Sequence, residues 1–397
     1  MSGYQYYEFR ALDRRLTAEQ QRRLRSLSSR AEISATRLAN EYSFGNFRGD
    51  PGRLLEEYFD AYLYAANWGT RELAFRLPRA LLDAETARRY CDEEHRAWVT
   101  ETSEHVIVWF RWDNDEGDDW IEGDGLLDPL LEARSELAAG DLRLLYLGWL
   151  LKVQLSGLDD EDDEDLGRED EGLADEVEPP VPAGLRQLSD SLAAAAKFLG
   201  IDDNLIATAA KASGPLAQVT DDGIAGWVTA LPASEKDKYL TMVAEGEGAQ
   251  AEALLVQRFR REARPAGSAP TSAERTAREL LAGAQARRAA REAAQARARA
   301  EARARRAAEQ AAAYERHLEQ LASRKDETWQ QVEKLTMFSK AKEYDQATQL
   351  LKDLHEIARR EDDTTAFTAR VRELRTRYMK RPSLMERFDK AGLPGLE

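Results

Sequence analysis

The sequence predicts an α+β protein that is predominantly helical and is built from several folded segments. Near the N-terminus, apolar and polar residues alternate with the period of two that is typical of half-buried strands. Later in the chain, apolar residues recur at spacings of three and four, which is typical of helices. Two strongly charged stretches separate these apolar regions, so the sequence favours several cores over one.

Residues 1–156 are expected to form an α/β head domain. Thr17 and Pro78 are residue types that begin helices, and they precede the helices expected at 18–30 and 79–90. Two further helices within 126–155 would complete the core. Apart from extra pieces, the coarse order is β-α-β-β-α-β, which fits a ferredoxin-like split βαβ sandwich, in which two helices cover one face of a sheet. The strands are expected at 7–11, 37–44, 61–65, 71–77 and 106–110.

An acidic stretch follows the head. Between residues 159 and 178 there are thirteen acidic residues and a single basic one, Arg168. Such a segment cannot bury enough apolar surface to offset the entropy lost on ordering, so residues 157–183 are expected to be an acidic disordered linker. Residues 184–264 are then expected to form a small helical domain, and residues 265–271 a second linker.

Residues 272–324 are expected to form one long helix rich in alanine and arginine. Between Leu281 and Leu318 the chain contains no Leu, Ile, Val, Met or Phe. Alanine and arginine favour helix, so a helix of about 45 residues and about 70 Å is expected. The absence of leucine at heptad positions argues against a stable coiled coil. The helix is therefore expected to be an exposed rod or a weakly docked arm.

Residues 325–397 regain the apolar periodicity of a folded domain. Helical spacing is visible from Trp329 to Leu335, from Tyr344 to Ala358 and from Phe367 to Tyr378. A short last helix is expected to begin at Pro382. Short loops between such helices predict an antiparallel C-terminal helical bundle.

The totals place the protein in a broad class. The chain has one cysteine, Cys91, which excludes an intrachain disulfide framework, and its longest apolar stretch is too short for a membrane span. Its first residues lack the layout of a secretory signal. These features predict a cytoplasmic protein without a transmembrane segment.

Several motifs were weighed as sites of chemistry. The glycines at 246–251 match the letters of a dinucleotide fingerprint, but a helix is expected before them where the motif needs a strand. The acidic turn at 113–124 does not match the glycine position of an EF-hand. Cys91 and His95 are only half of a metal site. No catalytic motif, metal or cofactor is therefore indicated, although carboxylates distant in sequence could still converge in space.

A stacking surface for RNA is a further alternative. Tyr4, Tyr6, Tyr62 and Tyr64 could line an open face of the sheet, where aromatic rings stack on bases in RNA-recognition domains. The basic and glycine residues of that motif are missing around Tyr62 and Tyr64. Burial of these rings under the helices of 126–155 is the other interpretation.

Three segments resemble a family of uncharacterised bacterial proteins. They are residues 6–14 (YYEFRALDR), 67–71 (NWGTR) and 381–384 (RPSL). The resemblance implies a bacterial source and no activity. Separately, the spacing from Tyr344 to Leu354 resembles the second helix of a single tetratricopeptide unit, which favours a role in protein binding.

Two functions follow as hypotheses. The leading one is a non-enzymatic scaffold that binds an unknown protein partner through the C-terminal bundle and the sheet face of the head. The alternative is nonspecific nucleic-acid binding, because residues 275–306 hold ten arginines against three glutamates, a local charge of +7, in a chain whose net charge is −16. In that case the acidic linker would compete for the same side chains. The candidate phosphate-binding residues are Arg287, Arg288, Arg291, Arg297, Arg299, Arg303, Arg305 and Arg306.

Overall fold

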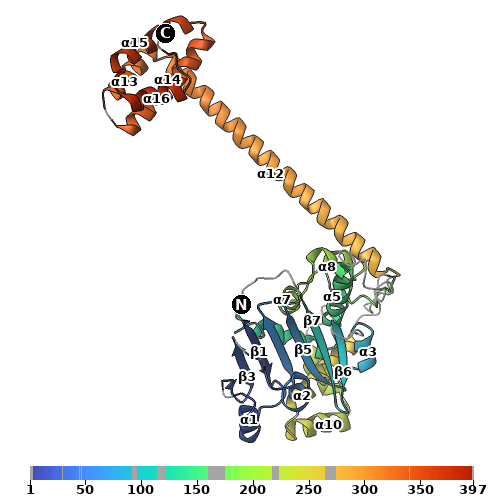
Figure 1. The fold of residues 1–397 in the computed structure, drawn as a ribbon. Helices are drawn as coiled ribbons and strands as arrows, with labels where there is room; N and C mark the ends of the chain where they lie inside the picture. Colours follow the sequence, from blue (N-terminus) through green and yellow to red (C-terminus); the bar gives the residue numbers. More distant parts are fainter. Residues whose placement is uncertain are drawn as a thin grey trace. The chain divides into compact units, whose positions relative to one another are not determined.

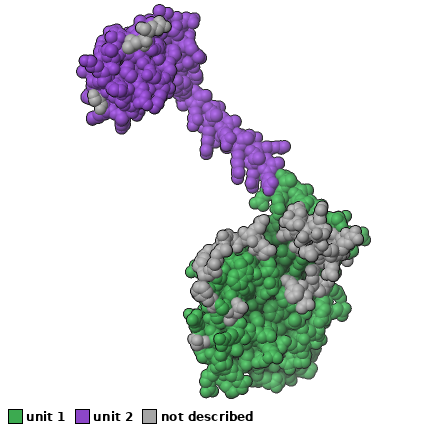
Figure 2. Space-filling view, in the orientation of Figure 1, with its two compact units in different colours: residues 1–291 green, residues 292–397 purple. Residues whose placement is uncertain are grey.

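The protein divides into two compact units, residues 1–291 and 292–397 (Figure 2). The computed structural model describes residues 3–28, 30–43, 45, 47–91, 96–113, 122–159, 175–216, 223–263, 274–338 and 340–395. The first unit contains a sheet and helices, and in the second the described elements are helices. About 58% of the described residues are helical, which confirms the mainly helical α+β class.

A seven-stranded antiparallel sheet organises the first unit (Figure 1). Its order is β2-β3-β1-β4-β5-β7-β6. Two short strands at its edges, β2 and β6, have no counterpart among the strands expected from the sequence. The strands are β1 (Gln5–Arg10), β2 (Glu32–Ile33), β3 (Arg37–Tyr42), β4 (Ala61–Ala66), β5 (Arg71–Pro78), β6 (Ala97–Glu101) and β7 (His105–Trp112).

The expected ferredoxin-like topology is not confirmed. The helix predicted at 79–90 is the five-residue α3 (Ala84–Arg88), and β7 lies beside β5 instead of beside β1, where that topology would place the last strand. A different helix, α2 (Pro51–Glu57), lies between β3 and β4 in the chain. The first four strands interleave, because β3 lies between β1 and β2 and β1 lies between β3 and β4.

Both faces of the sheet are buried in apolar clusters. Because side chains alternate along a strand, Leu63 and Phe75 lie on one face while Tyr62 and Ala74 lie on the other. The first face is covered by α4 (Leu131–Ala138), α5 (Arg143–Asp159), α7 (Asp190–Phe198) and α8 (Asp203–Ala209). The second is covered by α1 (Ala18–Arg25) and α2.

The segment expected to be a separate helical domain shares the core of the head. Leu192 of α7 and Leu205 of α8 belong to the same buried cluster as Leu63 of the sheet and Trp149 of α5. Since the apolar sides of these helices pack on the head, no boundary separates 1–156 from 184–264. Three further helices, α9 (Ile224–Ala230), α10 (Ala233–Ala244) and α11 (Gly248–Ala263), complete this unit. Leu240 of α10 is 66% exposed.

Part of the expected disordered linker is folded. Val177 forms a β-bridge with Thr276, and the Glu178 N–H donates to the Arg275 carbonyl oxygen. Glu178 is also buried. The prediction of disorder is therefore wrong for residues 157–159, which end α5, and for residues 175–183, where apolar and ionic contacts offset the entropy of ordering. Residues 160–174 and the second linker, 265–271, lie outside the described residues.

The long helix is α12 (Ala277–Ala322), with 46 residues. Its first turns belong to unit 1, where Ala277, Leu280 and Ala284 join the core. Its last turns belong to unit 2, where Leu318 and Leu321 contact Ile357. Every residue from 285 to 317 is exposed, so the prediction of an exposed alanine-rich and arginine-rich helix is confirmed for this stretch.

Unit 2 is a helical bundle, as predicted. Its helices are α13 (Lys325–Met337), α14 (Ala341–Arg360), α15 (Thr364–Tyr378) and α16 (Pro382–Lys390). They meet around Val332, Leu351, Val371 and Phe388, which are fully buried. Among the described residues, no helix has the length and apolarity that a membrane crossing needs.

Candidate polyanion-binding surface

The arginines selected from the sequence all lie on α12 and are all exposed. The sequence predicted cations on more than one side of this helix. A helix turns by about 100° per residue, which places all of them except Arg297 within an arc of about 160°. Arg297 projects from the opposite side, among alanines such as Ala293 and Ala304. We call the side without Arg297 the arginine face of α12.

Few of these charges are neutralised by neighbours. Arg288 pairs with Asp202, with 2.7 Å between Nη2 and Oδ2, and Arg305 lies 3.5 Å from Glu309 one turn away. Exposed pairs of this kind contribute little to stability. The remaining arginines of the face have no ion-pair partner among the described residues. The face therefore presents positive charge that is largely available to an external anion.

A groove of about 470 Å³ lies in unit 1 beside the beginning of this face. Its walls come from α7, α8, the segment that precedes α7, and α12. Its floor is aliphatic and includes Leu185, Ile206 and Ala210, which are almost completely buried. The groove thus combines an apolar floor with a solvent-accessible mouth.

Positively charged side chains surround the mouth of the groove. Arg186, Lys197, Lys211 and Arg287 line it, together with one acidic residue, Asp203. All four cations are exposed. The Arg186 side chain donates from Nε to the Ala210 carbonyl oxygen at 3.2 Å. Within the described ranges none of the four has an ion-pair partner, although acidic residues outnumber basic ones by 73 to 57 in the chain.

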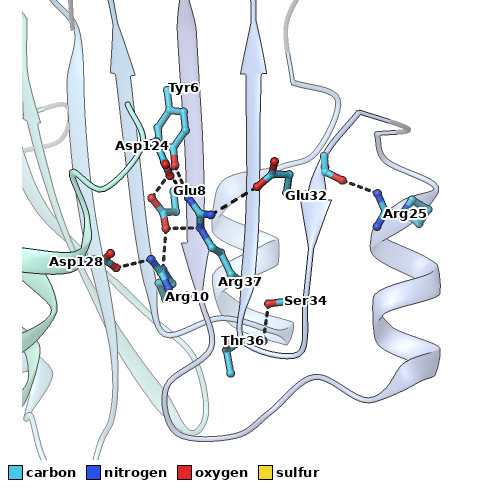
Figure 3. A network of polar contacts seen from close by, with 11 residues as sticks. Tyr6, Glu8, Arg10, Arg25, Glu32, Ser34, Thr36, Arg37, Asp124 and Asp128 are labelled. Carbon is cyan, nitrogen blue, oxygen red and sulfur yellow. Dashed lines mark hydrogen bonds and ion pairs between the residues drawn. The ribbon is translucent and has the colours of Figure 1, made fainter. Parts of the chain in front are cut away.

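Buried carboxylates of the sheet are, in contrast, neutralised by arginines. Glu8 is fully buried at the centre of a polar network on β1 and β3 (Figure 3). Its Oε1 lies 2.7 Å from Arg10 Nε and 2.8 Å from Arg37 Nε. The Tyr6 hydroxyl donates to Oε2 at 2.8 Å. Burial first, and then Glu8, raise the pKa of Tyr6 well above its ordinary value, so this phenol stays protonated.

Two other buried carboxylates have the same kind of environment. Asp60 lies 2.7 Å from Arg76, and its Oδ2 accepts the Leu12 N–H at 2.6 Å. Glu178 accepts hydrogen bonds from Arg275 at 2.7 and 2.8 Å. Each carboxylate has its own arginine partners, and within the described part of the chain no three metal-ligating side chains gather. This arrangement fixes loops and strands.

The other motifs weighed from the sequence are not brought together. His95 and most of the acidic turn, residues 114–121, lie outside the described residues, and Cys91 is buried. At the ends of that turn, Asp113 contacts Arg111, while Asp124 contacts Arg37. The glycines at 246–251 follow helix α10, not a strand.

The alternative of a stacking surface for RNA is contradicted by the positions of Tyr6, Tyr62 and Tyr64. Tyr6 pairs with Ala65, whereas Tyr7 pairs with Tyr64, so Tyr6 lies on the face opposite to Tyr62 and Tyr64. Tyr62 is 1% exposed and packs against Phe9 at 4.8 Å between ring centroids. Rings buried in this way cannot receive a base.

The groove is the feature that sequence reasoning missed. Only Arg287 was among the predicted residues, since Lys197 lies in a helix of ordinary composition, while Arg186 precedes α7 and Lys211 follows α8. Their one signal in the sequence is the scarcity of acidic residues between 191 and 201. Tertiary packing of α7, α8 and α12 brings these cations around one opening.

No family model matches the chain, and no curated protein or solved structure matches it. The resemblance of residues 6–14, 67–71 and 381–384 to a family of uncharacterised bacterial proteins therefore stays a prediction. The likeness of the Tyr344–Leu354 spacing to a tetratricopeptide helix stays one as well.

Proposed function

We propose that this protein binds nucleic acid duplexes, without base specificity, through the arginine face of α12. The observation that supports the proposal is the concentration of exposed arginines on one side of a single helix, most of which have no ion-pair partner among the described residues. Each arginine that reaches a phosphate releases counterions, which gives affinity that does not depend on sequence.

The dimensions of the helix favour a duplex as the ligand. The major groove of DNA is about 12 Å wide and admits an α-helix. Between residues 285 and 313 the side chains other than arginine are mostly alanine, so the helix is slim and its backbone can approach closely. Arginines spread over an arc of about 160° can reach phosphates on both borders of the groove.

The test uses fluorescence anisotropy of the full chain with a labelled duplex of about 24 base pairs over a series of salt concentrations. We expect Arg303→Gln to weaken binding and to lower the slope of log K against log salt by about 0.9. Arg297→Gln is the matched control, because it removes the same charge from the other side of the same helix. Equal effects of the two substitutions, or a slope near zero for the unmodified protein, would refute the proposal.

A second candidate function is the binding of a protein partner by the bundle, as a non-enzymatic scaffold. Met337, Phe338 and Met379 are 66%, 53% and 63% exposed. Arg381 joins the ends of α13 and α15, because it donates to the Met337 carbonyl oxygen at 3.3 Å and lies over the Tyr378 ring at 5.0 Å. Exposed apolar side chains that lie together are typical of interaction surfaces.

Affinity purification of the full chain, with nuclease present, tests this second function. The triple variant Met337→Ser, Phe338→Ser and Met379→Ser should lose a protein that the unmodified chain retains. Lys334→Ser combined with Lys352→Ser is the control, since both lysines are exposed on the same bundle. Retention of the same proteins by both variants would exclude the bundle end as the binding surface.

A further inference from the structure

We propose that the groove between α7, α8 and the beginning of α12 binds a small organic phosphate of the nucleotide class. This site differs from the duplex surface proposed above, because three of its four cations lie outside α12, and only Arg287 belongs to both. The inference rests on the size of the groove, the chemistry of its floor and the charge around its mouth.

The size of the groove suits a small molecule. Its volume of about 470 Å³ is within the range of about 300 to 1,000 Å³ that is usual for ligand sites. It is too small to admit a duplex. Its walls belong to packed helices, since Leu185, Ala196 and Ala210 are members of the main core of unit 1. The site is thus formed before any ligand arrives, which lowers the entropic cost of binding.

The charge around the mouth indicates a ligand with several negative charges. Four cationic side chains and only one carboxylate, that of Asp203, are among the residues that line the groove. A monocarboxylate would neutralise only one of them, whereas a di- or triphosphate can contact several at once. Arg186 and Arg287 can bind phosphate oxygens in the bidentate manner, and Lys197 and Lys211 can act as point charges.

The floor indicates that the ligand also has an apolar body. Leu188 and Ala193 offer aliphatic surface, together with the little that Leu185 and Ile206 expose, and inorganic phosphate would leave this surface uncovered. A base and its sugar could pack on this surface while the phosphates remain at the rim. An alkyl phosphate shares this chemistry, so the experiment has to separate the two sources.

Isothermal titration of the full chain with ATP, inorganic triphosphate, adenosine and decyl phosphate, in the presence of a chelator, tests the site. We expect ATP to bind at least about fivefold more tightly than triphosphate or adenosine. Triphosphate lacks the apolar body that packs on the floor, and adenosine lacks the phosphates that bind the cations. Equal affinity for ATP and triphosphate would show that only the charges of the groove contribute to binding, and it would overturn the proposal. Tighter binding of decyl phosphate would overturn the nucleotide assignment, and so would the absence of ATP binding at millimolar concentration.

Two variants make the test specific to the groove. Lys197→Gln with Lys211→Gln should weaken ATP binding about fivefold to tenfold. Lys238→Gln with Lys334→Gln removes the same charge from exposed positions elsewhere and should have no such effect. An equal loss in both double variants would overturn the proposal.

A substitution that fills the groove separates its floor from its rim. Ala193 lines the groove and is exposed, so Ala193→Trp can fill the space without disturbing the core. It should abolish the advantage of ATP over triphosphate, and retention of that advantage would count against the site. The double lysine variant leaves α12 intact, so its duplex binding should be unchanged. Failure of the duplex proposal and failure of this one are thereby distinguishable.

Discussion

Arg288 of α12 donates a hydrogen bond to Asp202, the N-cap residue of α8, with 2.7 Å between Nη2 and Oδ2. The other oxygen of the same carboxylate accepts the Asn204 N–H at 2.9 Å. One carboxylate therefore caps the beginning of α8 and also binds Arg288 at the start of the arginine face. Release of Arg288 should add one cation to the surface that is proposed to bind phosphates.

We expect Asp202→Asn to tighten duplex binding by a few fold and to steepen its salt dependence by at most about 0.9. Asparagine is also a good N-cap, so the free energy of unfolding should change by less than about 1 kcal/mol. Anisotropy and urea denaturation measure the two effects. Asp203→Asn is the control, because it makes the same charge change in the same turn without freeing an arginine. A stronger gain from Asp203→Asn would contradict the prediction.

The acidic stretch should weaken duplex binding if it competes for the arginine face. Residues 160–171 hold nine acidic residues and one arginine. Their replacement by the corresponding amides should tighten duplex binding and steepen its salt dependence. Glu176 and Glu178 are to be left intact, because they bind Lys152 and Arg275 within unit 1. Anisotropy that shows no change in either quantity would exclude competition.

Glu8→Gln should destabilise unit 1 by about 1 to 3 kcal/mol. The substitution leaves Arg10 and Arg37 without the buried charge that lies between them, although both keep an exposed partner in Asp128 and Asp124. Urea denaturation monitored by tryptophan fluorescence measures the loss. Glu32→Gln should change stability by less than about 0.5 kcal/mol, since Glu32 is 81% exposed and 3.6 Å from Arg37. Similar losses for both would show that burial of Glu8 is unimportant.

Asp60 should make stability depend on pH in acid. Burial alone would raise the pKa of this carboxyl, but Arg134 and Arg76 outweigh it and hold the pKa below its ordinary value of 3.8. Because the pKa is lower in the folded state, the contribution to stability is present above the ordinary value and is lost as pH falls through the folded value. Asp60→Asn should therefore be less stable at neutral pH and lose less stability between about pH 5 and about pH 3. The midpoints of urea denaturation across this pH range measure the difference between the two proteins. The same dependence on pH in both would contradict the role given to Asp60.

Gly148→Ala should destabilise the protein, although alanine favours helix by about 1 kcal/mol. An added Cβ would meet Cε1 of the buried Phe110 at 2.4 Å, and overpacking of this kind costs about 1 to 3 kcal/mol. Gly226→Ala in α9 is the matched case, since nothing lies within 4 Å of the added atom. It should stabilise by about 0.5 to 1 kcal/mol. Thermal unfolding that shows the same sign for both would refute the packing argument.

Local sequence patterns were sufficient to predict elements whose conformation depends on residues close by in the chain. The alternation at residues 71–77 predicted β5, and the alanine and arginine content of 272–324 predicted α12. Strands β2 and β6 escaped because they are short and pair only with one neighbour at the sheet edge. The ferredoxin-like order failed for a related reason, since strand pairing depends on contacts between residues far apart in the chain.

The sequence also showed which segments are acidic and which are basic. It did not show which individual charged side chains are exposed and which are paired. The sequence identified the arginines of α12, while it left open which of them were compensated. It described residues 159–178 as uniformly acidic and solvated, yet Glu178 is buried against Arg275, 97 positions away. The composition of a segment can predict that a charged side chain is exposed. The same side chain can still be buried when a residue far away in the chain neutralises its charge.

The sequence by itself determined many of the helical and strand segments, the exposed arginine-rich helix and the C-terminal bundle. These follow from the period of apolar residues and from intrinsic propensity, which act within one or two turns of chain. Only the tertiary structure decided that residues 184–264 share the core of the head and that Arg186, Lys197, Lys211 and Arg287 surround one groove. Both outcomes depend on which apolar faces pack together, and that choice is made by the summed burial of side chains from distant segments.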